Sequence, residues 1–265
     1  MIRLPISSAR AQWRAATGHD DIAVADSEAG LPGALACVNR SVQDADGTPI
    51  DGAALPVGDL DLLVVARRRE IRGDSFVAEG TCARCGAPVD VRFSLAAYAD
   101  HHRPRVPRGV IDDGAGWWRL PGGEVTVRVP SIADVLAAVA AGEGARGRGE
   151  LLARCVRGPG TAAAVRAAER AMAALGPTLR ADVAGTCPEC GADVALDVDA
   201  RELCLAELRF LAASVYDDVH LIASAYGWTQ DVILDLPSVR RRRYADLIAG
   251  RPEFAMPPVE AVPVG

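Results

Sequence analysis

Two copies of one cysteine motif constrain the fold of this chain more than any other feature of its sequence. The first copy reads GTCARCGA at positions 80–87, and the second reads GTCPECGA at positions 185–192. Both copies are flanked by alternating apolar residues, a pattern typical of β-strands. A chance pair of CxxC sequences would not share these neighbours, so the repeat predicts two β-hairpins with equivalent cysteine turns.

The spacing of the cysteines suits one metal ion. Two thiolates separated by two residues can point at the same metal from a tight turn, and the glycine after the second cysteine allows the positive φ that turns backbone amides toward the sulfurs. Each turn supplies half of a tetrahedral shell. We therefore predict one structural zinc ion per chain, with the hairpins meeting across a pseudo-twofold axis and with these ligands: Cys82, Cys85, Cys187 and Cys190.

Three other interpretations of these four cysteines stay open: redox chemistry, disulfides, and a site that has lost its metal. Redox chemistry of the thioredoxin type would need a helix after the first cysteine, whereas β-type residues follow here. Two disulfides would need an oxidising compartment, and the sequence shows no signal peptide.

His101 and His102 could in principle replace one thiolate. Cys37, Cys155 and Cys204 lie on apolar helix faces and are predicted to be small core residues.

Composition bounds the fold and the partners. Half of the 265 residues are hydrophobic but only 5% are aromatic, so the core must be mostly Ala, Val and Leu, which suits close-packed helices. The net charge of −6 argues against a general phosphate-binding surface. The longest apolar run, at 135–141, is far too short for a bilayer span, and no hydrophobic signal core is visible. These features predict a cytoplasmic location.

The order of predicted elements repeats: an extended piece, a helix, a helix with a cysteine, a helix and a knuckle hairpin. This order indicates an internal duplication that makes Cys37 and Cys155 equivalent. The predicted class is α+β and predominantly helical, with a duplicated helical unit plus a β-hairpin zinc knuckle, split and zinc-ribbon-like, before a C-terminal helical segment. The predicted segments are a first repeat at 1–98, an exposed connector at 99–116, a second repeat at 117–200, C-terminal helices at 201–250 and an extended tail at 251–265.

Three element predictions carry specific residues. A helix is expected from Ser7 or Ser8 to Gly18, with Trp13 on its apolar face. A single long helix is expected at 201–225, with Asp217 and Asp218 on its solvated face and with a glycine at 227 ending it. Short helices capped by a threonine at 229 and a serine at 238 complete the C-terminal segment.

The C-terminal third resembles a known family. The run DVHLIASAYGWTQDVILDL at 218–236, followed by RRRRY at 240–244, is similar to a family of phage and phage-tail-like proteins, described as tied to the baseplate hub assembly chaperone or catalyst of T-even phages. LPVGD at 55–59 also fits an element of that family. This chain departs from the family pattern in lacking a proline after Cys82 and in its long connector around His101.

The resemblance implies assembly of a contractile tail rather than catalysis. The chain would be an assembly factor or minor structural component of the baseplate of a phage tail or a phage-tail-like injection system, in the cytoplasm or in the assembled particle, and would bind other tail proteins. The sequence contains no phosphate loop, nucleophile elbow or HExxH motif, so we expect no enzyme, no small-molecule substrate and no membrane partner. A zinc-ribbon adaptor that contacts nucleic acid is the alternative.

A partner site is predicted where the long helix turns a corner. Tyr226 and Trp228 stand on either side of the glycine at 227, and aromatic residues held at a corner are typical interface anchors. Arg241 is predicted to join them at this site. The alternative is that Trp228 packs against the helix of Leu247 and Ile248 and belongs to the core.

Overall fold

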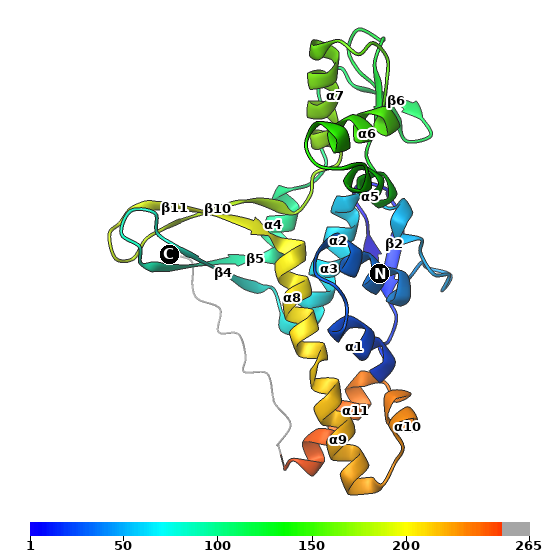
Figure 1. The fold of residues 1–265 in the computed structure, drawn as a ribbon, viewed down its shortest axis with the longest axis vertical. Coiled ribbons are helices and arrows are strands. Elements are labelled where there is room, and N and C mark those ends of the chain that lie inside the picture. Colours follow the sequence, from blue (N-terminus) through cyan, green and yellow to red (C-terminus); the bar gives the residue numbers. More distant parts are fainter. Residues whose placement is uncertain (251–265) are drawn as a thin grey trace. The chain divides into compact units, whose positions relative to one another are not determined.

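A computed structural model of the chain describes residues 1–250 and divides into two compact units. Unit 1 comprises residues 1–14 and 27–208, and unit 2 comprises residues 15–26 and the chain from 209 onward. The protein is mixed α/β with small antiparallel sheets and more helix than strand, which agrees with the predicted α+β class (Figure 1). The predicted tail at 251–265 lies outside the described residues, and the five predicted segments themselves stay a prediction.

The first part of unit 1 surrounds the long helix α3. A three-stranded antiparallel sheet has the order β1-β2-β3, and the first cysteine hairpin, β4–β5, follows α3 directly. The helix buries Leu60, Leu63 and Val64. The elements are β1 (Ile2–Arg3), β2 (Arg10–Trp13), α2 (Gly30–Ser41), β3 (Val42–Gln43), a 3₁₀ turn (Gly52–Ala54), α3 (Val57–Arg72), β4 (Ser75–Thr81), β5 (Pro88–Ser94) and α4 (Leu95–His101).

The second part of unit 1 has a four-stranded antiparallel sheet, in the order β6-β7-β8-β9, and it ends with the second cysteine hairpin. A core of Val127, Cys155, Ala168 and Met172 lies between this sheet and α7. The elements are β6 (Ile111–Gly114), β7 (Trp117–Arg119), β8 (Thr126–Arg128), α5 (Ile132–Ala141), α6 (Ala145–Cys155), β9 (Val156–Arg157), α7 (Ala162–Leu175), β10 (Arg180–Thr186), β11 (Asp193–Asp199) and α8 (Ala200–Ala212).

The order of elements repeats along the chain, although the equivalent residues differ from the predicted ones. In both halves a two-residue strand, β3 or β9, directly follows a helix and pairs with an earlier strand. In this correspondence between the halves, Ser41, the last residue of α2, is equivalent to Cys155, the last residue of α6. The predicted equivalence of Cys37 and Cys155 is therefore wrong. A better marker is the capping box, which occurs with Asp20 at the start of α1 (Gly18–Ala25) and with Asp134 at the start of α5.

The predicted helix around Trp13 is wrong, because β1 and β2 form a hairpin there. The turn is fixed by a distant carboxylate: Asp59, in the first turn of α3, accepts hydrogen bonds from the amides of Ile6 (3.0 Å) and Ser7 (2.8 Å). The indole of Trp13 donates to the carbonyl of Leu63 (3.0 Å). Tertiary contacts with α3 thus override the weak helical pattern of this segment.

The predicted connector at 99–116 is only partly irregular. Helix α4 continues to His101, and β6 takes up Ile111–Gly114, so regular structure enters the connector at both ends. A hairpin follows the connector, in which β7 and β8 pair in antiparallel register with Trp118 opposite Val127.

Unit 2 is a small helical bundle. Its core contains Ile222, Ile233 and Ala245, one from each of three helices. The predicted long helix at 201–225 is wrong, because the chain forms α8 and then α9, with a turn at Ala213 where the Ser214 hydroxyl donates to the Leu211 carbonyl (2.9 Å). The helices of this unit are α1 (Gly18–Ala25), α9 (Ser214–Tyr226), α10 (Gln230–Leu234) and α11 (Ser238–Ile248).

The ends of these helices match the sequence pattern closely. Gly227 ends α9 in the left-handed conformation, with φ 67° and ψ 19°, as a glycine C-cap does. Thr229 stands at the N-cap position of α10 as predicted, but its side chain forms no capping hydrogen bond. Ser238 does not cap α11, because Pro237 holds the N-cap position and the Ser238 hydroxyl instead donates to Asp21 (2.7 Å).

Candidate metal centre

The turns of the two cysteine hairpins bring four sulfur atoms together. Cys82, Cys85, Cys187 and Cys190 form a cluster in which all Sγ atoms lie within 4.8 Å of one another. The closest pairs cross between the hairpins, with 3.7 Å from Cys82 to Cys190 and 3.7 Å from Cys85 to Cys187. A tetrahedral ion with metal–sulfur bonds of about 2.3 Å separates its ligands by about 3.8 Å. The spacing therefore fits four sulfur ligands around one metal ion.

The two turns have the same hydrogen bonds. In the first, the amide of Cys82 donates to Ala87 (2.8 Å) and Gly86 donates back to Cys82 (2.9 Å). In the second, Cys187 donates to the carbonyl of residue 192 (2.8 Å), and the glycine at 191 donates back to Cys187 (3.0 Å). Both glycines have positive φ, 73° and 68°, as the sequence predicted.

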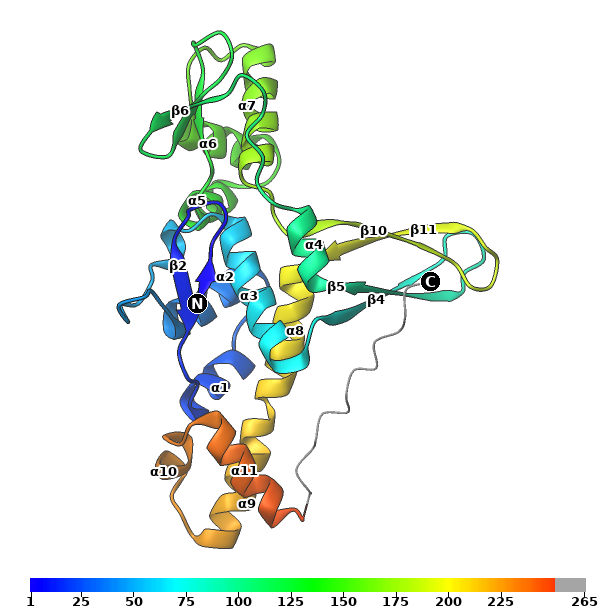
Figure 2. The same ribbon diagram turned by 180° about the vertical axis from the view of Figure 1, so that it is seen from behind.

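The hairpins also match in length, register and packing. Each has two strands of seven residues, and equivalent positions lie 105 residues apart in the sequence. The two hairpins lie side by side with their turns at the same end in both views (Figure 1, Figure 2). A Cβ atom on Gly80 would lie 2.4 Å from Leu196 of the other hairpin, and one on Gly185 would lie 2.6 Å from Val91. These contacts are reciprocal, so the two glycines of the GTC motif allow the hairpins to approach each other.

The sulfur atoms differ in their surroundings. Cys82 and Cys187 are buried among Val89 and Val194, whereas Cys85 is exposed. The pKa of Cys82 is lowered to about 6 because the backbone amides at 85 and 84 donate to its sulfur. The amide of residue 192 lowers the pKa of Cys190, but burial and the three neighbouring sulfurs outweigh it and raise this pKa to about 12. Without a metal the cluster thus favours one thiolate, whereas a bound metal ion deprotonates its thiol ligands.

The other cysteines and the histidines lie outside the cluster. Cys37, Cys155 and Cys204 are buried, as predicted for core residues. Burial raises the pKa of Cys155 to about 11 and that of Cys204 to about 12, so both thiols stay protonated. His101 and His102 end α4, and the His102 ring contacts the Tyr98 carbonyl (2.7 Å) rather than any cysteine.

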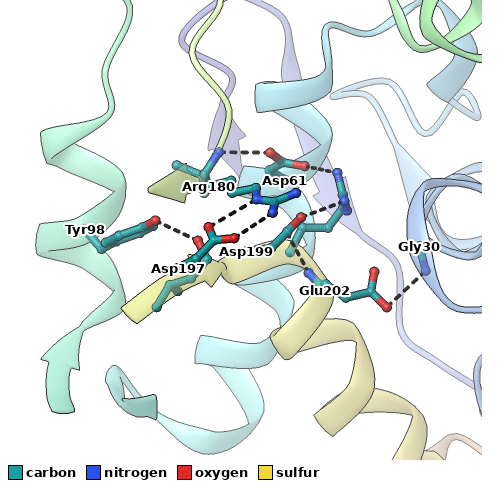
Figure 3. Close-up of polar contacts among 10 residues, drawn as sticks. Gly30, Asp61, Tyr98, Arg180, Asp197, Asp199 and Glu202 are labelled. Atoms are coloured by element: carbon teal, nitrogen blue, oxygen red, sulfur yellow. Dashed lines mark hydrogen bonds and ion pairs between the residues drawn. The ribbon is translucent and has the colours of Figure 1, made fainter. Parts of the chain in front are cut away.

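A polar network fixes the base of the second hairpin to the helices (Figure 3). The buried Asp61 of α3 accepts from the Leu179 amide (3.0 Å) and from Arg201 (3.1 Å), and Arg201 also contacts Asp199 (3.1 Å). Burial raises the pKa of Asp61 to about 6 against the opposing effect of Arg201. The Tyr98 hydroxyl donates to the carbonyl of residue 198 (3.1 Å). The sequence gave no signal for this network, because its members are separated by up to 140 residues.

The predicted partner residues at the corner of unit 2 separate into two environments. Tyr226 and Trp228 contact each other and Tyr244 of α11, with ring centroids 5.4, 6.1 and 5.4 Å apart. The rings touch, so no ligand fits between them. Tyr226 is 47% exposed and Trp228 is 36% exposed. We call these three residues the aromatic corner.

Arg241 is fully buried, so its predicted place at an exposed site is wrong. Its guanidinium forms salt bridges with Asp21 (2.5 Å) and Asp218 (3.0 Å). Asp218 is buried as well, which also corrects its predicted place on a solvated face. Burial raises the pKa of Asp218, and Arg241 opposes this shift. Of the four consecutive arginines at 240–243, Arg241 is thus the one that is buried where α11 packs against its neighbouring helices.

Comparisons of the chain with protein-family models, with curated proteins and with solved structures find no match. Within residues 1–250, none of the helices is both long and apolar enough to cross a membrane. The four-cysteine cluster, which could hold a metal ion, is therefore the feature from which a function can be argued.

Proposed function

We propose that the four cysteines hold one zinc ion with a structural role in a split zinc-ribbon-like arrangement. The observation that carries this proposal is the pair of crossed sulfur distances, 3.7 Å each, between matching hairpins. Four thiolates fill a tetrahedral shell and leave no position for substrate, which is typical of structural rather than catalytic zinc. The ion would tie together two hairpins that each have only two strands and are marginal alone.

Elemental analysis tests the metal directly. Protein purified without chelator should contain one zinc per chain, and Cys82→Ser or Cys190→Ser should lower this ratio. Cys204→Ser is the matched control, because that thiol is buried but lies outside the cluster. No zinc, or two zinc ions per chain, contradicts the proposal.

We propose further that the protein is an assembly factor or minor structural component of the baseplate of a contractile phage tail or phage-tail-like injection system. The proposal depends on the resemblance of the 218–244 region and on the exposed aromatic corner within it. Half-exposed aromatic rings on a rigid corner are suited to anchor a protein interface. In this proposal the protein binds other tail proteins and catalyses no covalent reaction.

Co-purification with the tail proteins of the same particle tests this role. Trp228→Ala should abolish co-purification or tail assembly with only a small fall in melting temperature, which reflects the lost ring contacts with Tyr226 and Tyr244. Phe210→Ala is the matched control, because this aromatic residue is 82% exposed and lies outside the aromatic corner. A large fall in melting temperature for Trp228→Ala would instead place the ring in the core. Tight, steeply salt-dependent binding to nucleic acid would favour the adaptor alternative.

A further inference from the structure

A hollow of about 350 Å³ lies beside α7, where that helix meets the segment before β6 and the end of β7. Its floor is apolar and includes Val110, Leu120 and Ala167. Two arginines, Arg108 and Arg170, also line it. The hollow therefore combines an apolar floor with positive charge.

The backbone holds this hollow open. The amide of Arg105 donates to the carbonyl of Ala174 in the last turn of α7 (2.8 Å), and Val110 closes a turn by donating to Pro107 (3.1 Å). Gly109 has φ +79°, and a Cβ there would lie 3.1 Å from the ring of a proline that lines the hollow. The glycine at 109 thus allows this turn to lie close to Pro121. These contacts indicate a preformed site.

The stretch of chain that contains the hollow has an excess of positive charge, in contrast to the chain as a whole. All 29 Lys+Arg residues of the chain are arginines, and its net charge is −6. Positions 103–178 nevertheless hold eleven arginines and only seven acidic residues. Within residues 1–250, Arg108 and Arg170 have no salt bridge, and neither has Arg166, one turn before Arg170 on α7. The acidic residue next to Arg170 in the sequence, Glu169, is already paired with Arg148 (2.6 Å).

The chemistry of the hollow selects its ligand. The planar guanidinium group forms paired hydrogen bonds with carboxylates, and an apolar floor binds an aliphatic or aromatic side chain. Phosphate would satisfy the arginines equally well, but no aromatic side chain lines the hollow to stack against a base. The negative net charge also opposes a long polyanion.

We infer that this hollow is a docking site for an acidic segment of a partner protein. The segment places one apolar side chain on the floor and its carboxylates against Arg108 and Arg170. This inference rests on the proposed function, since it names the chemistry of a protein partner. It concerns a different surface from the aromatic corner.

Binding of a labelled peptide to the zinc-loaded full chain tests the site. The probe is a peptide of about ten residues with a Leu-Phe centre flanked by Glu and Asp, followed by fluorescence anisotropy. The double variant Arg108→Glu with Arg170→Glu should raise the Kd at least about tenfold, because two charge-assisted contacts become repulsive. The control is Arg10→Glu with Arg146→Glu, which makes the same change of net charge at exposed positions that do not line the hollow and should change the Kd less than about threefold.

Two further probes separate the alternatives. A peptide with Gly-Gly in place of Leu-Phe should bind at least about tenfold more weakly, because it leaves the apolar floor exposed to water. An oligothymidylate of equal charge should also bind more weakly than the peptide. The inference is overturned if the wild-type chain does not bind the acidic peptide, if the control variant weakens binding as much as the test variant, or if the oligonucleotide binds better. None of these results depends on zinc content or on the Trp228→Ala experiment, so this inference can fail while the proposed function stands.

Discussion

Replacing Gly80 with alanine tests whether the two hairpins pack as the structure shows. A methyl group at this position lies 2.4 Å from Cδ2 of Leu196 and 3.4 Å from its Cδ1, whereas carbon atoms in contact lie about 3.5–4.0 Å apart. Overpacking of this kind costs about 1–3 kcal/mol. Replacing glycine at a tolerant backbone position contributes about 0.4–1 kcal/mol in the opposite direction, because the unfolded chain loses freedom. The contacting atoms are the terminal methyl groups of the half-buried Leu196, which can turn partly aside, so the steric cost lies toward the lower end of this range and Gly80→Ala should destabilise the protein by roughly 0.5–1 kcal/mol.

The sign should reverse once the obstructing side chain is removed. In a Leu196→Ala background the new methyl group meets none of the Leu196 atoms beyond Cβ, so Gly80→Ala should stabilise that background by about 0.4–1 kcal/mol. The free energy of unfolding is measured by urea denaturation of all four proteins in the presence of excess zinc. Gly160→Ala serves as the control, since no atom lies within 4 Å of a Cβ at that site.

An equal loss of stability in both backgrounds would refute this reasoning, because the cost would then arise in the backbone of β4 rather than between the hairpins. The second hairpin offers an independent repeat of the experiment. A Cβ on Gly185 lies 2.6 Å from Cγ2 of Val91, so Gly185→Ala should also change sign when Val91 is replaced by alanine.

Three other variants test the remaining interactions. Cys187→Ser should destabilise the fold far more than Cys204→Ser. Loss of a structural zinc removes part of a binding free energy of about 10–16 kcal/mol, whereas loss of a buried thiol costs about 1–3 kcal/mol. Equal melting temperatures for the two variants would contradict this prediction. Arg241→Ala should cost about 3 kcal/mol in urea denaturation, because it leaves the buried carboxylate of Asp218 and the half-buried carboxylate of Asp21 without their cation. Arg240→Ala, at an exposed position, should cost less than about 0.5 kcal/mol. Asp134→Asn should lower stability most at about pH 7 and somewhat less at about pH 3. The hydrogen bonds from Arg128 hold the folded pKa of this carboxyl far below its unfolded value of about 3.9, so its contribution is complete above the unfolded pKa and declines as the pH falls from there through the folded pKa. The differences between wild type and variant at the two pH values check this sign.

The four-cysteine cluster was the part of the structure most accessible from sequence. The repeated GTCxxCGA motif contains the ligands, the positive-φ glycines and the glycines that let the hairpins meet, so local pattern and tertiary contact agree there. The helices with strong caps were equally predictable. Ser131 accepts from the amide of Asp134 at the start of α5, and Gly227 ends α9, and both were visible as residue types at the correct positions.

Errors occurred where distant residues decide the local structure. Trp13 lies in a strand because Asp59, from α3, fixes the preceding turn. Arg241 was expected at an exposed partner site beside Tyr226 and Trp228, but it is buried with two carboxylates, one of which lies 220 residues away in the sequence. The salt bridges of Arg241 and the network around Asp61 depend on three-dimensional neighbours, and no local pattern in the sequence signals them.

The distance between the two cysteine turns along the chain has a consequence during synthesis. Cys82 and Cys85 leave the ribosome 105 positions before their counterparts. At elongation rates of about 5–20 residues per second, the first pair of cysteines has been synthesised for roughly 5 to 20 s before the second pair follows. The sulfur shell of the proposed zinc site cannot be completed within the same chain during this interval, so the first pair of cysteines would stay metal-free or half-ligated. Its two thiols are then open to capture by another nascent chain, and polysomes that carry several copies close together make such mispairing a specific hazard of this architecture.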